Sequence, residues 1–257
     1  MGAASFVVDP RDPRAPAQDV WDQLSEEARQ RIVASLPSDV PRAGPPEGDA
    51  HRVPKSRALD SLDEHFRRIG RRVYLSSELP VYYPTEPMFA PDVIAVLDVE
   101  THERQSWVVS QDRRGLDFVL EIHVAGSASK DFEENVSRYS RLGIPEYFAF
   151  DVPRRRLCGW RLPQAGRAYE SIVPQGGRWR SGVLALDLVC DAGRLRFFHG
   201  AAAVLDSREL IAQLSTMVDD AVRRAEHEAQ RAEHAAQRVA RLAARLRALG
   251  VDPDEVE

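Results

Sequence analysis

The chain has 257 residues, of which 43% are hydrophobic and 29% charged, so it is globular and long enough to bury a substantial core. Its formal net charge of −5 excludes a general electrostatic attraction to nucleic acid, so any such contact depends on local basic patches. No apolar run has transmembrane length, and two separated cysteines, Cys158 and Cys190, favour a reducing, cytoplasmic setting without membrane attachment.

The N-terminal part, residues 1–44, is expected to be a flexible segment with one helix. Residues 1–17 are rich in proline, aspartate and alanine. The following pattern predicts a helix over residues 21–36, with Ser25 as a plausible N-cap. Five prolines between positions 37 and 54 then predict an extended connector.

A second helix is predicted over residues 56–69, because its apolar residues share one face and Gly70 suits the position after its end. Two strand-like segments follow, at residues 72–75 and 79–83. Pro91-Asp92 then opens a further β run, residues 93–99, and residues 106–110 are expected to form the outgoing arm of a hairpin.

Residues 115–151 predict a strand–helix–strand unit with its polar groups at the carboxyl side of the first strand. In the run 118–124, alternation separates Phe118, Leu120 and Ile122 from Glu121 and His123. A buried glutamate requires a partner for its charge, and carboxylates from adjacent strands suit a hard divalent cation such as Mg²⁺. Asp92 is the second candidate. The alternative is an edge strand with Glu121 in water.

The predicted helix 131–142 starts at Asp131, which fits a capping box with Glu134 and so has a structural role without catalysis. Asn135 lies on the same polar stripe as Asp131 and could point toward the carboxylates. Beyond Asp151, further strands close the domain near residue 198.

The short motifs of this chain, taken in order, resemble those of the Uma2 family of endonucleases, a branch of the PD-(D/E)XK nuclease superfamily. The resemblance covers roughly residues 45–200. The matching motifs are Pro91-Asp92, the strand ending at Glu121-Ile122, Asp131, Tyr139, and Leu142-Gly143-Ile144-Pro145-Glu146-Tyr147, which is followed by a strand that ends at Asp151.

The resemblance implies a restriction-endonuclease-like α/β (α+β) fold, in which helices flank a mixed β-sheet core. It also implies Mg²⁺ or Mn²⁺ held by Asp92 and Glu121, helped by the carbonyl of Ile122. An early glutamate assists the metal in some members of the superfamily, and Glu47 is the candidate here, although an exposed turn carboxylate is the favoured interpretation.

The sequence departs from the family pattern at the lysine. The strict motif has lysine at position 123, where this chain has His123, and the helical position often occupied by lysine is Asn135. Lys55 and Lys130 are the only lysines in the chain, and Lys130 is the nearer to the site in sequence. A partly buried lysine can exchange a proton whereas arginine cannot, so Lys130 is a candidate for orienting or deprotonating water. A solvated helix start explains it equally well.

The C-terminal part, residues 206–257, has a different pattern. Residues 207–249 contain neither proline nor glycine, and apolar residues alternate spacings of three and four, with Glu228 as the exception. This heptad pattern predicts a coiled-coil-type helix that forms a homodimer. Folding back on the domain formed by residues 45–205 is the alternative.

Two functions follow. The first is a magnesium-dependent endonuclease that hydrolyses phosphodiester bonds of nucleic acid, with DNA as the expected substrate and Lys130 or His123 steering the water. The second is a catalytically inactive nuclease fold that has lost the motif lysine, binds or scaffolds, and self-associates through its terminal helix.

Overall fold

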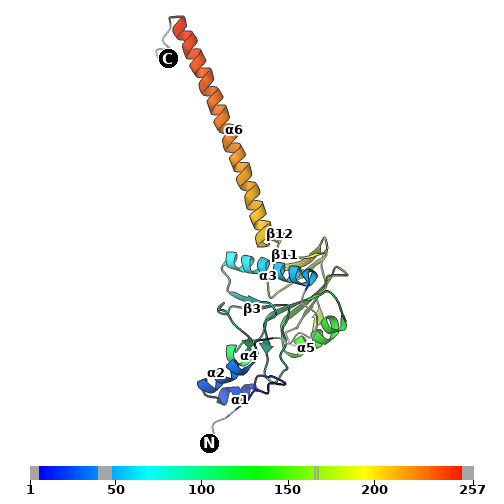
Figure 1. Ribbon diagram of the computed structural model, residues 1–257. Coiled ribbons are helices and arrows are strands. Elements are labelled where there is room, and N and C mark those ends of the chain that lie inside the picture. Colours follow the sequence, from blue (N-terminus) through cyan, green and yellow to red (C-terminus); the bar gives the residue numbers. More distant parts are fainter. Residues whose placement is uncertain (1–5, 40–47, 165, 167, 251–257) are drawn as a thin grey trace. The chain divides into compact units, whose positions relative to one another are not determined.

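The structure is a computed structural model that describes residues 6–39, 48–164, 166 and 168–250. Glu47, the candidate accessory residue, lies outside the described residues. The chain divides into two compact units, Met1–Asp206 and Ser207–Glu257 (Figure 1). The N-terminal segment thus belongs to the same unit as the sheet.

A mixed sheet forms the centre of the first unit and confirms the predicted fold class. Its strand order is β1-β3-β5-β6-β7-β8. β5 and β6 are parallel, whereas the other neighbours are antiparallel. The parallel pair is joined by a helical segment, as predicted for residues 115–151. The strand bounds are β1 Val73–Ser76, β3 Val93–Leu97, β5 Phe118–His123, β6 Glu146–Asp151, β7 Arg156–Arg161 and β8 Glu170–Ser171.

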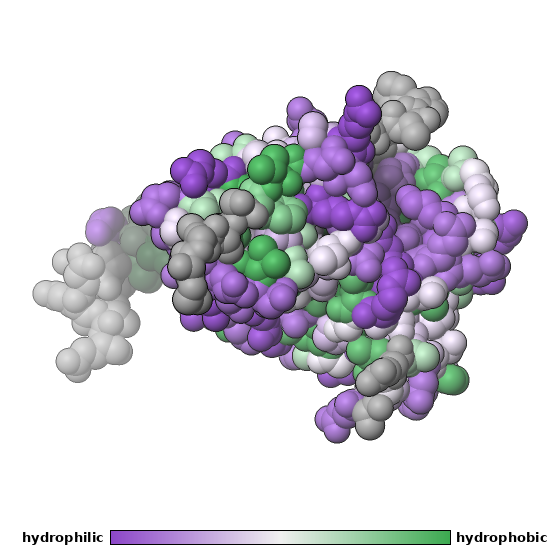
Figure 2. All heavy atoms as spheres, turned by 90° about the horizontal axis from the view of Figure 1, so that it is seen from below, coloured by the Kyte–Doolittle hydropathy of each residue, from purple (hydrophilic) through white to green (hydrophobic). Residues whose placement is uncertain are grey.

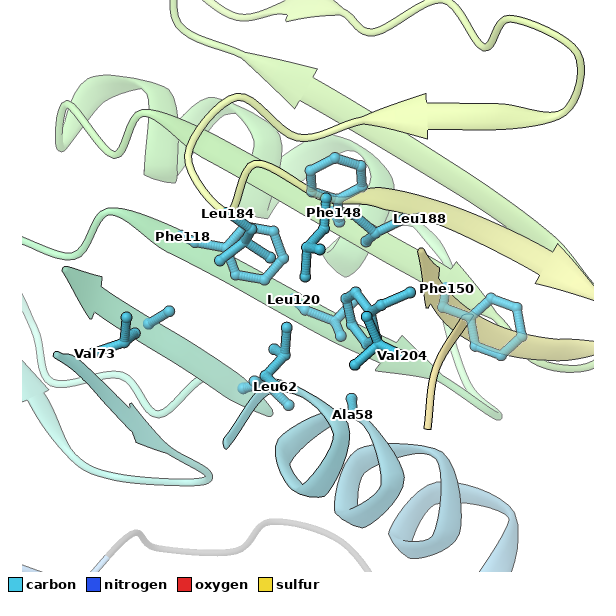
Figure 3. Packing of buried hydrophobic residues seen from close by; sticks show 14 of the residues in the cluster. Ala58, Leu62, Val73, Phe118, Leu120, Phe148, Phe150, Leu184, Leu188 and Val204 are labelled. Atoms are coloured by element: carbon cyan, nitrogen blue, oxygen red, sulfur yellow. The ribbon is translucent and has the colours of Figure 1, made fainter. Parts of the chain in front are cut away.

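The two faces of this sheet bury different clusters, as the alternation along β5 predicts. Phe118, Leu120 and Ile122 pack on the face covered by the long helix α3 (Asp49–Ile69) and by a second sheet. Figure 3 shows this side, where Ala58 and Leu62 of α3 lie toward Leu120 and Val204. The opposite face packs against α5 (Asn135–Arg141) and the loops around it.

The second sheet has the order β12-β11-β10-β9 and is antiparallel throughout. Its strands are β9 Arg178–Arg180, β10 Asp187–Asp191, β11 Arg194–His199 and β12 Ala202–Val204. The prediction that residues 106–110 form the outgoing arm of a hairpin is wrong. Instead, β4 (Trp107–Val108) pairs in parallel with β2 (Val81–Tyr82), and α4 (Val109–Asp112) follows directly.

The N-terminal segment is packed, contrary to the expected flexibility of residues 6–17. Val8 and Ala15 are buried with Trp21 in a cluster that also contains Tyr82. Where the sequence predicted one helix, the structure has two, α1 (Gln18–Gln23) and α2 (Glu26–Ser35). Ser25 separates them and caps α2 by accepting a hydrogen bond from the Ala28 amide, as predicted.

Helix α3 begins at Asp49, so residues 49–54 are helical where a connector was expected. Pro54 lies inside the helix. Gly70 ends it in the left-handed conformation, with φ of 68°, as its position predicts. The early start matters because it places His51 and Lys55 on a helix.

The second unit contains α6 (Ser207–Ala248), a helix of 42 residues that confirms the predicted long C-terminal helix. None of its residues is buried, and Val218, Val239 and Leu242 are at least 60% exposed.

Among the described residues, no helix is long and apolar enough to span a membrane. The face of the molecule in Figure 2 is mostly hydrophilic, with apolar residues in small groups.

Candidate metal and active site

Asp92 and Glu121 meet because β3 and β5 are neighbours. Val93 lies opposite Leu120, so Asp92, one residue before β3, comes level with Glu121. The Asp92 amide donates a hydrogen bond to Glu121 Oε2 at 3.2 Å. β5 lies between β3 and β6, and Glu121 is 6% exposed, so the edge-strand interpretation is wrong.

The Asp92 carboxylate is held from two sides. Its Oδ2 accepts a hydrogen bond from the Ile122 amide at 2.7 Å and lies 2.9 Å from His51 Nε2. Burial opposes the charge of Asp92, but the hydrogen bond and charge of His51, with the Ile122 amide, keep its pKa below the ordinary value. Asp92 is therefore ionised and oriented.

The Glu121 carboxylate is in the opposite electrostatic situation. Tyr139 donates a hydrogen bond to its Oε1 at 2.7 Å, and Asn135 Nδ2 lies 3.4 Å from the same oxygen. Burial raises the pKa of Glu121 well above its ordinary value, and the negative charges of Asp92 and Asp131 add to this. A cation bound between the two carboxylates would offset the repulsion between their charges and favour the ionised form of Glu121.

His123 and Asp131 form a further pair, with Nδ1 and Oδ2 2.9 Å apart. The predicted capping box is wrong because Asp131 lies inside a π-helical turn, Lys130–Glu134, that precedes α5. Its buried side chain faces His123 and Asn135 instead of the helix start. Tyr147 donates to the Asp131 carbonyl at 2.7 Å and fixes this turn.

An open pocket of about 570 Å³ joins these groups. Asp92, Glu121, His123, Asp131 and the exposed Lys130 all line it, together with Ile122. Asn135 contacts Glu121 and Asp131. The structure therefore brings together all the described residues that the sequence singles out.

Three residues near Asp92 were missed by sequence reasoning. One ligand atom each from His51, Glu78 and Asp92 lies within 4.8 Å of the others. Lys55 Nζ, which is buried, donates to Glu78 Oε1 at 2.7 Å. His51 and Lys55 are four residues apart on α3, which is a detectable signal once that helix is extended through Pro54.

A larger cavity of about 750 Å³ lies at the other end of the sheet, around the start of β1. Of its arginines, Arg67 pairs with Glu64, and Arg71 pairs with Asp98. The two carboxylates in its lining, Asp63 and Glu103, are exposed, whereas Asp92, Glu121 and Asp131 of the smaller pocket are buried, so we place the candidate site in the smaller one.

Comparison with known proteins gives one family. The Uma2 family, described as "Putative restriction endonuclease", matches residues 22–192. No curated protein matches the chain. Among solved structures, a crystal structure of a "putative nuclease belonging to DUF820" from Anabaena variabilis ATCC 29413 is similar, with 14% identity and a TM-score of 0.46, and the alignment covers 59% of this chain and 83% of that one.

Proposed function

This chain belongs to the Uma2 family, and we propose that it is a metal-dependent endonuclease that hydrolyses phosphodiester bonds of nucleic acid, with DNA as the substrate. The observation that carries the proposal is the meeting of Asp92 and Glu121 in an open pocket. Two carboxylates this close, one of them with a raised pKa, are suited to a divalent cation.

The residues fit Mg²⁺ or Mn²⁺, because oxygen donors from Asp92 and Glu121 reach the pocket from adjacent strands. The carbonyl of Ile122 is the third proposed ligand. When bound, such an ion supplies Lewis-acid polarisation of the scissile phosphate and lowers the pKa of an attacking water.

Residues around the carboxylates have separate roles in this proposal. Tyr139 and Asn135 hold Glu121 in one orientation. Lys130 lines the pocket and is exposed, not partly buried, so its role in this proposal is to orient the water. Asp131 fixes the ring of His123, which is the second candidate for this role.

A basic turn beside the pocket supports nucleic acid as the substrate. β5 and β6 are parallel, with His123 level with Asp151, so the arginines that follow Asp151 lie on the same edge of the sheet as the carboxylates. Arg154 and Arg156 each stay more than half exposed although they pair with Asp151. Exposed guanidinium groups bind phosphates well.

The substitution of lysine by His123 favours the second candidate function, an inactive scaffold that keeps the fold and loses hydrolysis. Cleavage of plasmid DNA, single-stranded DNA and RNA with Mg²⁺ or Mn²⁺ decides between the two. We expect DNA cleavage by wild type and none by Asp92→Asn or in EDTA. Equal traces of activity in wild type and Asp92→Asn would support the scaffold.

We also propose that α6 pairs with α6 of a second copy, because its apolar stripe is exposed along the whole helix. Both cysteines are free thiols, in line with the proposed cytoplasmic location.

A further inference from the structure

We infer that His51 and Glu78 extend the carboxylate pair into a mixed nitrogen–oxygen cation site, which binds a first-row transition-metal ion more tightly than Mg²⁺. This inference rests on the proposed function, since it concerns the ion at Asp92. It differs from that proposal by adding an imidazole ligand and a metal preference.

The distances suit coordination by one ion. Ligands about 2.1 Å from a metal lie roughly 3 Å apart when they are neighbours in an octahedron. His51 Nε2 and Asp92 Oδ2 are 2.9 Å apart, and the donor atoms of His51, Glu78 and Asp92 all lie within 4.8 Å of one another. A small contraction brings the three donors onto a common ion.

The three donors are held by different parts of the fold. His51 is in the first turn of α3, and Asp92 precedes β3. Glu78 follows β1 with φ of 51°, and its amide donates to the Pro91 carbonyl at 2.9 Å, which ties it to the residue before Asp92. Lys55 then orients the Glu78 carboxylate from α3.

The donors also remain accessible to an ion from solution. The side chains of His51 and Asp92 are 24% and 12% exposed, and that of Glu78 is 32% exposed. His51 and Glu78 line the same pocket as Asp92 and Glu121. An ion that enters this pocket therefore reaches the donor atoms of His51, Glu78 and Asp92, and Glu121 lines the same pocket.

The chemistry of the donors sets the preference. Mg²⁺ favours oxygen ligands and water, whereas imidazole nitrogen favours transition metals. A site built from Asp92 and Glu121 alone would bind Mg²⁺ and Mn²⁺ as oxygen sites do. The addition of His51 shifts the ratio of affinities toward the transition metal.

The test titrates metal-free full-length protein with MnCl₂ and with MgCl₂ by calorimetry, without nucleic acid. Loss of a residue that only orients a metal ligand typically weakens metal binding about 10- to 100-fold. Because His51 is proposed as a direct ligand, we expect His51→Ala to weaken Mn²⁺ binding at least that much and to change Mg²⁺ binding far less. His51→Gln covers the case in which the alanine variant fails to fold. His102→Ala is the matched control, because His102 is an exposed histidine in the loop beyond the far end of β3.

Pulsed electron paramagnetic resonance of the Mn²⁺-loaded protein gives a direct readout. Wild type should show nitrogen modulation from an imidazole ligand, which both His51 variants lose and His102→Ala retains. If the signal is absent in wild type, or if the Mn²⁺/Mg²⁺ affinity ratio is the same in His51→Ala, the inference is wrong, although the proposed nuclease stands. If wild type binds neither ion, both proposals fail.

Discussion

The electrostatics of the site give opposite pH dependences to its two carboxylates when no metal is bound. Folded Glu121 keeps its proton to a higher pH than the unfolded chain does, because its pKa is raised. The contribution of Glu121 to the stability of the fold is therefore fully present below the ordinary glutamate pKa, and it is lost as the pH rises from the ordinary to the raised value. Asp92, with its lowered pKa, contributes stability above the ordinary aspartate pKa, which is lost as the pH falls through the folded value.

Glu121→Gln should accordingly abolish divalent binding and raise the melting temperature in EDTA at neutral pH by about 2–4 °C, or roughly 1 kcal/mol. Asp92→Asn should also lose the metal but lower that temperature. Calorimetric titration and thermal melts check both. Retained metal affinity in Glu121→Gln would remove Glu121 from the site.

Tyr139 and Tyr147 allow a comparison, since both are buried tyrosines and only Tyr139 donates to a proposed metal ligand. Tyr139 donates to the Glu121 carboxylate, whereas Tyr147 donates to the backbone carbonyl of Asp131. We expect each change to phenylalanine to cost about 1–2 kcal/mol of stability. Metal affinity should fall about tenfold or more in Tyr139→Phe and stay near wild type in Tyr147→Phe. Equal metal affinity in the two variants would contradict the role of Tyr139.

The two lysines should differ in what they support. Lys130 is exposed at the pocket rim, so Lys130→Ala should change stability by less than about 0.5 kcal/mol while lowering cleavage about 10²- to 10⁴-fold and keeping metal binding. Asn135→Lys should retain or increase activity. Lys55→Met, by contrast, breaks the buried ion pair with Glu78 and should cost about 1–3 kcal/mol, less than a fully buried pair because Glu78 is partly exposed. Unimpaired cleavage by Lys130→Ala would transfer the role to His123.

At the scale of elements, the turn between β6 and β7 should contact the phosphate backbone. The Val152 amide donates to the His123 carbonyl at 2.9 Å, and the Arg156 guanidinium lies 4.9 Å from the ring centre of Phe132, so the turn is fastened to the pocket wall. Arg154→Glu with Arg155→Glu should weaken DNA binding and lower the slope of log affinity against log salt by about 1 for each phosphate that the protein no longer neutralises.

Arg68→Glu is the control for this prediction. Arg68 is exposed near the end of α3, and the residues that follow it lead into β1 at the other end of the sheet. It changes the net charge in the same way per substitution. A similar decrease of slope per charge in this variant would show that binding depends on overall charge, and not on the turn.

Elements with a local signal were predictable, and those set by distant contacts were not. The alternation in β5 and the position of Asp92 at the start of a β run predicted that Asp92 and Glu121 meet, whereas Asp131 was predicted to cap a helix. α3 was shortened in the prediction because Pro54 is a helix breaker by propensity, while in the fold the apolar face of α3 packs on the sheet. His51 was missed with that turn. Glu78 depends on a left-handed backbone conformation and an ion pair with Lys55 that no local pattern encodes.

At the scale of the whole molecule, the prediction concerns self-association. Along one edge of the apolar stripe of α6, arginines recur every seven residues at Arg224, Arg231, Arg238 and Arg245, and along the other edge the residues are small or apolar. Antiparallel pairing sets like edges against each other and so sets arginine against arginine, whereas parallel pairing avoids this. We therefore expect a parallel dimer, in which Glu228 is neutralised by Arg224 and Arg231.

Light scattering at tens of micromolar tests this arrangement. Full-length protein should be dimeric, and a chain ending at Leu205 monomeric. Val218→Asp with Leu242→Asp should give a full-length monomer, whereas Gln230→Asp with Gln237→Asp, on the outer face, should leave the dimer intact. The prediction is wrong if wild type is monomeric or if the shortened chain dimerises equally well.

The π-helical turn at Lys130–Glu134 also limits which deletions the chain can tolerate. Such a turn holds one residue more than an α-helical turn of the same span. If Glu134 were deleted, an α-helical turn could close the same span, so Lys130 and α5 would keep their places. The loss of one residue would thereby be absorbed inside the turn, whereas the same loss inside α5 would turn either Asn135 or Tyr139 away from Glu121.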